Sequence, residues 1–124
     1  MHVSHRVLLV EDDYFVSLEI EHQLRLAGFD VVGVATTAEE AVGIARGRHP
    51  ELVIMDVRLA GPRDGIDAAI ELMDEYGIHS IFATAHDDIG TRSRAARAEP
   101  LGWIQKPYVP AQLIEMINSV FGGL

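Results

Sequence analysis

The sequence predicts an α/β fold in which a doubly wound, five-stranded parallel sheet is covered by helices on both faces. Five short apolar segments alternate along the chain with five stretches of helical periodicity, an order typical of parallel strands joined by right-handed crossovers. The apolar run 52–55, bounded by turn residues, is also typical of a strand buried on both faces. For such units the common strand order is 2-1-3-4-5, with a switch point between strands one and three.

The first strand covers residues 6–10 and leads into a helix whose apolar residues recur at spacings of four, four and three. An acidic side chain, Asp12 or Asp13, is expected to cap the start of this helix, and Gly28 is expected to stop it. The residues expected to share its buried face are Val16, Ile20, Leu24 and Ala27.

The second strand, residues 31–35, precedes a helix that Thr36 or Thr37 is expected to cap and that closes before Pro50. The residues expected on its inner face are Ala38, Ala41, Ile44 and Ala45.

The second half of the chain continues the alternation. The run 52–55 is the third strand, and strands four and five are residues 80–84 and 102–105. A third helix ends near Tyr76-Gly77, and the last helix covers residues 110–121. The residues expected to face inward are Ile66, Ala69, Ile70 and Met73 in the third helix, and Leu113, Ile114, Ile117 and Val120 in the last.

The segment between strands four and five, residues 87–99, is expected to form only a short or mobile helix. It contains Gly90, and it offers only Ile89 and small alanines for burial. Its basic face either contacts a partner or is simply solvated, and solvation is the interpretation favoured here. The residues of this basic face are Arg92, Arg94 and Arg97.

Composition excludes several classes of function. The net charge of −9 argues against a surface for nucleic acid or anionic membranes, because phosphate binding requires an excess of Lys and Arg. The chain has no cysteine, so disulfides, thiolate metal sites and thiol catalysis are excluded. Its apolar stretches are too short to span a membrane, and residues 1–10 lack the apolar core of a secretory signal. We therefore expect one cytoplasmic domain, residues 1–124, without an output domain.

Carboxylates follow two strands that the predicted order makes neighbours. Glu11 and Asp12 follow the first strand, and Asp56 follows the third. Two carboxylates ~4 Å apart repel by roughly 4 kcal/mol at an effective dielectric constant near 20, so such a cluster requires a cation or a proton. Oxygen ligands without His or Cys favour Mg²⁺. Taken alone, Glu11 and Asp12 are better explained as caps of the first helix, but their coincidence with Asp56 favours metal binding.

Two further polar side chains end strands at the same edge of the sheet, namely Thr84 in strand four and Lys106 after strand five. A hard cation, an ammonium and a hydroxyl together form a receptor for a phosphoryl group, because they stabilise its distributed negative charge. In that setting Asp56 can act as a nucleophile and carry an aspartyl phosphate. Individually, Thr84 is explained equally well as a strand-forming residue, whereas a solvated charge is only a weaker alternative for Lys106.

Four short motifs lie at the ends of the predicted strands: Val10-Glu11-Asp12-Asp13, Ile54-Met55-Asp56, Ala83-Thr84-Ala85 and Lys106-Pro107. Together they resemble the response-regulator receiver domain of two-component signalling, which implies a flavodoxin-like receiver fold. The resemblance extends over nearly the whole chain, from residue 7 to about residue 120. Each motif alone is weak, but all four in this order on five strand–helix units are highly specific.

The resemblance implies how the site would bind its ligands. Asp56 would be the phosphoacceptor, while Glu11, Asp12, Asp56 and the backbone carbonyl of Arg58 would hold Mg²⁺ as the cofactor. A histidine kinase or a histidine phosphotransfer protein would dock at the start of the first helix, unless the residues there are tucked into the core. These docking residues are Tyr14, Phe15 and Leu18.

The resemblance also assigns the remaining groups. Thr84 would bond a phosphoryl oxygen, and Lys106 would pair with the phosphate. Because the family usually has a cis Lys-Pro bond, we expect a cis Lys106–Pro107 bond, which the trans preference of only ~0.5–1 kcal/mol allows. Thr84 and Trp103 are the expected switch residues, with Trp103 at the position where the family usually carries Tyr or Phe. His86 is expected to be a solvent-facing loop residue rather than one that controls water access.

Two further departures from the family pattern concern the switch rather than the phosphoacceptor. The loop 56–65 is one residue longer than usual, with Gly61-Pro62-Arg63 near its crown. The stretch Ile81-Phe82-Ala83-Thr84 resembles a divergent subfamily with a Phe-Ala-Thr signature, found largely in single-domain regulators whose fourth strand–helix unit is often atypical.

The favoured function is a stand-alone response regulator that accepts a phosphoryl group and then acts on an unknown downstream protein or serves as a phosphate sink. A homodimer is left open. A phosphatase of the haloacid-dehalogenase type would need an Asp-x-Asp arrangement after strand one, and an FMN carrier would need a hydroxyl-rich loop there. A degenerate receiver that binds partners without phosphorylation is a third alternative, against which Asp56, Thr84 and Lys106 argue.

Overall fold

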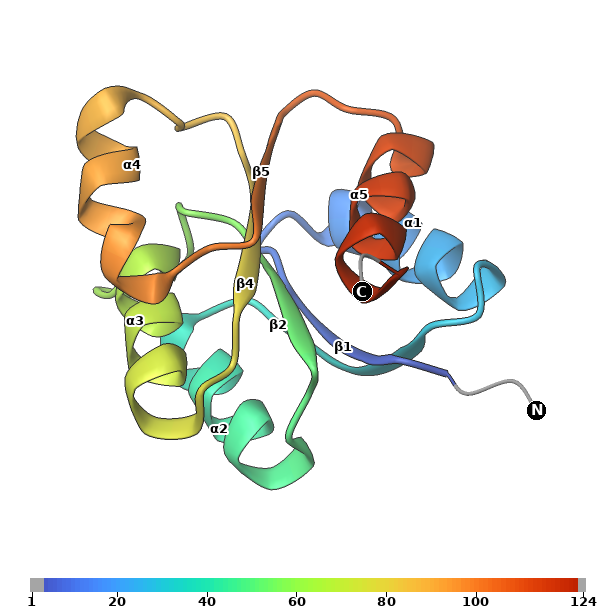
Figure 1. Cartoon of the computed structure of the whole chain (residues 1–124), viewed down its shortest axis with the longest axis horizontal. Helices are drawn as coiled ribbons and strands as arrows, with labels where there is room; N and C mark the ends of the chain where they lie inside the picture. Colours follow the sequence, from blue (N-terminus) through green and yellow to red (C-terminus); the bar gives the residue numbers. More distant parts are fainter. Residues whose placement is uncertain (1–3, 123–124) are drawn as a thin grey trace.

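The computed structural model describes residues 4–122. Its elements are β1 (Arg6–Val10), α1 (Tyr14–Leu26), β2 (Asp30–Ala35), α2 (Ala38–Arg48), β3 (Leu52–Met55), α3 (Gly65–Tyr76), β4 (Ser80–Thr84), α4 (Ile89–Ala95), the 3₁₀ turn η1 (Ala96–Ala98), β5 (Gly102–Gln105) and α5 (Pro110–Gly122). The strands form one parallel sheet in the order β2-β1-β3-β4-β5, which confirms the predicted fold class. Helices α2, α3 and α4 lie on one side of the sheet, and α1 and α5 lie on the other (Figure 1).

The sheet separates two hydrophobic clusters, because successive side chains of a strand point to opposite faces. Leu8 and Val10 of β1 belong to the cluster shared with α2 and α3, whereas Val7 and Leu9 belong to the cluster shared with α1 and α5. All four are at most 2% exposed, and each such burial contributes roughly 1.5–3 kcal/mol. Within residues 4–122, no helix combines the length and apolarity that crossing a membrane requires.

Side-chain caps decide where the first two helices begin. Asp13, not Asp12, caps α1 and accepts hydrogen bonds from two backbone amides of its first turn. Thr37, not Thr36, caps α2 by accepting a hydrogen bond from a backbone amide. Because Asp13 serves as the cap, the carboxylate of Asp12 is available at the edge of the sheet.

The buried stripe of α3 differs from the predicted one. Ile66 and Ala69 are buried as expected, but Leu72 is also fully buried, while Ile70 and Met73 are only half-buried. Leu72 continues the three-residue spacing of Ile66 and Ala69, so the stripe that faces the sheet follows that spacing and leaves Ile70 and Met73 at its flanks.

Two further expectations about burial are wrong. Ala27 is exposed, because α1 ends at Leu26 and Ala27 is its C-terminal cap. Ile89 is 88% exposed at the start of α4, whereas the burial expected of the small alanines is confirmed for Ala95 and Ala98. The helix in this segment is short, as predicted, with seven residues.

Candidate functional site

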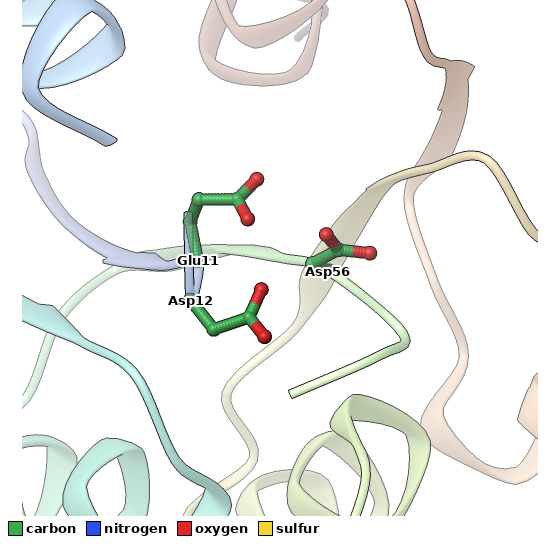
Figure 2. Close-up of side chains that lie close together, drawn as sticks. All are labelled: Glu11, Asp12 and Asp56. Carbon is green, nitrogen blue, oxygen red and sulfur yellow. The ribbon is translucent and has the colours of Figure 1, made fainter. Parts of the chain in front are cut away.

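The ends of β1 and β3 lie side by side, because these strands pair in parallel with Val10 opposite Met55. The amide of Asp56 donates a hydrogen bond to the carbonyl of Val10 at 3.0 Å, which fixes the first residue after β3 beside β1. Figure 2 shows the side chains of Glu11, Asp12 and Asp56 gathered around one space. Carboxylate oxygens of the three residues lie within 4.8 Å of one another. The structure thus assembles this acidic cluster, and its binding of a metal stays a prediction.

The ammonium of Lys106 compensates two of these carboxylates. Its Nζ donates a hydrogen bond to Asp56 Oδ2 at 2.7 Å and also contacts Glu11 Oε1. Glu11 and Asp56 are only 4% and 7% exposed, so their charges would be costly without a cation beside them. Asp12, by contrast, is exposed. Lys106 is the only lysine of the chain, so an amine-selective reagent would report on this site alone, apart from the N-terminus.

Burial and ion pairing shift the pKa values of two groups in this cluster. Burial has the largest influence on Glu11 and raises the pKa of its carboxyl, although hydrogen bonds from Lys106 and from the Asp13 amide act in the opposite direction. Burial acts to lower the pKa of the Lys106 ammonium, but hydrogen bonds to Asp56 and Glu11 outweigh it and raise that pKa. Lys106 is therefore cationic throughout the neutral pH range.

Thr84 and Lys106 are positioned by the pairing of β4 with β5. Thr84 is fully buried opposite Gln105, and the Lys106 amide donates a hydrogen bond to the Thr84 carbonyl at 3.0 Å. Thr84 Oγ1 accepts a hydrogen bond from the amide of His86 at 3.1 Å, which leaves the hydroxyl proton available for an acceptor. His86 itself is half-buried rather than fully solvent-facing. The Lys106–Pro107 peptide bond is cis.

The loop after Asp56 is closed by Gly65, a requirement that the sequence analysis missed. The Gly65 amide donates a hydrogen bond to the carbonyl of Val57 at 2.7 Å and brings the start of α3 against the backbone of Asp56. A Cβ atom at position 65 would overlap the Asp56 carbonyl oxygen and lie 2.8 Å from its carbonyl carbon. Glycine is therefore needed here because two backbone segments approach closely.

The crown of the loop 56–65 is attached to the connection between β2 and α2. The Ala60 amide donates a hydrogen bond to the Thr36 carbonyl at 3.2 Å, and Ala60 forms an isolated parallel bridge with Thr37. Gly61 follows with a φ of +90°, a conformation that favours glycine. Arg58 is exposed on the same loop, and the role of its carbonyl as a metal ligand stays a prediction.

The predicted docking residues form an exposed apolar surface on α1. Tyr14, Phe15 and Leu18 are 67%, 80% and 51% exposed, so the alternative that they are tucked into the core is wrong. Other residues of α1, Val16, Glu19 and Ile20, line a groove of about 540 Å³ between α1 and the β5–α5 connection, which reaches Lys106 and is bordered by Tyr108. The sequence analysis missed Tyr108. Burial raises the pKa of its hydroxyl to about 12, so the hydroxyl stays protonated.

Trp103 packs against its neighbours from β5, the edge strand of the sheet. Its ring stacks on Phe82 of β4 with centroids 4.6 Å apart, because the two residues are direct partners across the strand pair. The guanidinium carbon of Arg92 lies 4.7 Å from the centroid of the Trp103 ring. Trp103 is therefore in contact with α4, and its role as a switch stays a prediction.

Comparison with known families gives one match over most of the chain. The model of the response regulator receiver domain matches residues 7–118. The curated relatives include the transcriptional regulatory protein PdtaR of Mycobacterium tuberculosis, which is 36% identical over 94% of this chain. This chain spans 56% of PdtaR, that is, about half of the relative's length.

Two further relatives match along almost their whole length. The chemotaxis protein CheY of Thermotoga maritima is 31% identical, over 93% of this chain and 96% of its own. The crystal structure of the signal receiver domain of a modulated diguanylate cyclase from Desulfovibrio desulfuricans G20 superimposes with a TM-score of 0.88. That domain is 32% identical, with 98% of this chain and 96% of its own covered.

Proposed function

This chain belongs to the response regulator receiver family, and from that premise we propose that Asp56 accepts a phosphoryl group from a phosphohistidine in a Mg²⁺-dependent reaction. The family membership argues against the phosphatase and FMN-carrier alternatives. The observation that carries the proposal is the position of Asp56, whose carboxylate has oxygens of Glu11 and Asp12 within 4.8 Å and accepts a hydrogen bond from the Lys106 ammonium.

Three side chains at this edge of the sheet take part in the proposed transfer. A carboxylate oxygen of Asp56 attacks phosphorus, and the P–N bond of the donor breaks with its electron pair passing to the imidazole nitrogen, which takes up a proton. The product is an acyl phosphate on Asp56. Lys106, which donates a hydrogen bond to Asp56 before the transfer, can donate one to a phosphoryl oxygen after it. The Thr84 hydroxyl can donate a hydrogen bond to another phosphoryl oxygen.

The donor set fits a magnesium ion. Glu11, Asp12 and Asp56 supply oxygen ligands from a site that the Arg58 carbonyl can complete, and Mg²⁺ prefers oxygen. When bound, the ion would neutralise charge that develops on the phosphoryl oxygens. Lys106 supplies one positive charge to this cluster, so a divalent ion is a second source of compensation for the exposed carboxylate of Asp12.

The partners follow from the exposed surface of α1. A helix of a histidine kinase or a phosphotransfer protein would place its apolar side chains on the exposed residues Tyr14, Phe15 and Leu18. We expect residues 1–124 to act as one receiver domain that signals by contact with a downstream protein or acts as a phosphate sink.

Incubation of the protein with acetyl phosphate and Mg²⁺ tests the function. The intact mass should increase by one phosphoryl group, and chelation of Mg²⁺ before the addition should prevent the increase, because the acidic cluster then lacks its second cation. No increase with acetyl phosphate or with a phosphorylated histidine kinase would contradict the proposal.

Neighbouring acids provide a matched test of the metal site. Asp12→Asn should weaken Mg²⁺ binding by on the order of tenfold or more, because a charged oxygen ligand is lost. Asp13→Asn should change the affinity little, because asparagine still caps α1 and Asp13 is not in the cluster. Isothermal titration with Mg²⁺ measures both, and equal losses in the two variants would argue against Asp12 as a ligand.

A further inference from the structure

Helix α4 is held to the domain with little apolar burial. It has seven residues, of which only Ala95 is buried, and η1 adds the small side chain of Ala98. The one large apolar residue of α4, Ile89, is 88% exposed. Because burial of two alanines stabilises a helix only weakly, other contacts must hold α4 in its place.

Arginines provide these contacts. Arg94 Nη2 donates to both carboxylate oxygens of Asp64, at 2.7 and 2.6 Å, and lies 3.4 Å from an oxygen of Asp67. Arg97, in η1, pairs with Asp74 of α3 at 3.0 Å. The basic face of this segment is exposed, as expected, and its arginines also pair with acids of the same chain.

Asp64 places one of these ion pairs at the end of the loop 56–65, which is called the phosphoacceptor loop below because it begins at Asp56. It is the last residue before α3 and caps that helix by accepting a hydrogen bond from the Asp67 amide at 3.0 Å. The next residue, Gly65, is hydrogen-bonded to Val57, which follows Asp56 directly. One backbone hydrogen bond, from Gly65 to Val57, therefore joins the residue after Asp64 to the residue after Asp56.

The charge state of Asp64 agrees with a tight pair. Burial acts to raise the pKa of its carboxyl, but hydrogen bonds from Arg94 and from the Asp67 amide outweigh burial and lower that pKa. The side chains of Arg94 and Asp64 are 50% and 30% exposed, whereas those of Arg97 and Asp74 are 74% and 51% exposed. The Arg94 pair is the less solvated of the two and should be the stronger.

We propose that Arg94 is an electrostatic latch that ties α4 to the end of the phosphoacceptor loop through Asp64. A change in that loop would then shift α4, and with it the contact of Arg92 on Trp103. The static part of the proposal rests on the geometry of the free protein alone. Its signalling consequence rests on the proposed function of Asp56.

Amide hydrogen exchange in the free protein tests the latch. Arg94→Gln keeps helix propensity and length but removes the charge, and it should speed exchange of the amides of residues 92–98 about threefold. Arg97→Gln is the matched control and should increase the exchange rates of these amides less. In Asp64→Asn, which still caps α3, adding Arg94→Gln should have little further effect. Equal effects of the two arginine variants, or additive effects with Asp64→Asn, would overturn the latch.

The signalling consequence is tested with beryllofluoride, a phosphoryl analogue, and Mg²⁺. Trp103 is the only tryptophan, so its fluorescence reports the contact with α4. Loading should change this fluorescence in the wild type, and the change should fall by about twofold or more in Arg94→Gln although fluorine NMR still shows bound beryllofluoride. An undiminished change in the loaded variant would overturn the coupling. Absence of bound beryllofluoride in the wild type would instead count against the proposed function, while the exchange experiment still decides the latch.

Discussion

Replacing Gly65 by alanine should destabilise the fold by about 3 kcal/mol, at the upper end of what overpacking usually costs. The new Cβ atom would overlap the carbonyl oxygen of Asp56 and lie 2.9 Å from Met55 Cγ. To remove this overlap, the start of α3 would have to move away from the backbone of Asp56, because the carbonyl oxygen and carbon of Asp56 are backbone atoms and cannot rotate aside as a side chain can. Urea denaturation of the variant measures the loss of unfolding free energy.

Gly43→Ala is the matched control for this prediction. Gly43 is exposed within α2, and a Cβ atom there meets nothing within 4 Å. This substitution should raise the free energy of unfolding by about 0.5–1 kcal/mol, because alanine favours a helix interior. If Gly65→Ala were as stable as the wild type, the close approach of α3 to Asp56 would be refuted.

Replacing Lys106 by methionine should cost about 3 kcal/mol of unfolding free energy at pH 7, because two buried carboxylates lose their cation. Without the Lys106 hydrogen bond, the already raised pKa of Glu11 rises further. A carboxyl with a higher pKa in the folded than in the unfolded chain binds its proton preferentially when folded. The deficit should therefore shrink as the pH falls from 7 toward about 5, near the unfolded value.

Urea denaturation at several pH values measures this effect. Mg²⁺ should also reduce the deficit, because a second cation replaces the lost charge, and Lys106→Arg should keep most of the stability. The methionine variant should in addition accept phosphoryl groups on the order of a hundredfold more slowly, since the ammonium beside Asp56 is gone. Wild-type stability and an unchanged transfer rate in Lys106→Met would contradict its assigned role.

The sheet and the acidic cluster were predictable from local sequence signals. The run 52–55 and its counterparts are apolar because both faces of the sheet are covered, and the parallel order follows from the alternation with helices. That order alone puts Glu11 beside Asp56. The capping of α1 was narrowed to Asp12 or Asp13, and the structure assigns it to Asp13.

Contacts between elements were not predictable in the same way. In the 87–99 segment the sequence offers Ile89 as the one large apolar residue to bury, whereas α4 is positioned by Arg94 and Asp64, thirty residues apart. The need for glycine at position 65 depends on how closely α3 approaches β3, and no local pattern encodes that distance. Tyr108 likewise borders the Lys106 groove only because α1 packs beside the β5–α5 connection.

The position of the phosphoryl group is the most direct test of the account. After incubation with acetyl phosphate and Mg²⁺, borohydride reduces an acyl phosphate to an alcohol, so that the modified aspartate becomes homoserine and is located by peptide mass spectrometry. Homoserine should appear in place of Asp56 and at no other carboxylate, and Asp56→Asn should give none. Reduction at Glu11, Asp12 or another acid, or a phosphoryl adduct that persists in Asp56→Asn, would contradict the assignment of Asp56 as the phosphoacceptor.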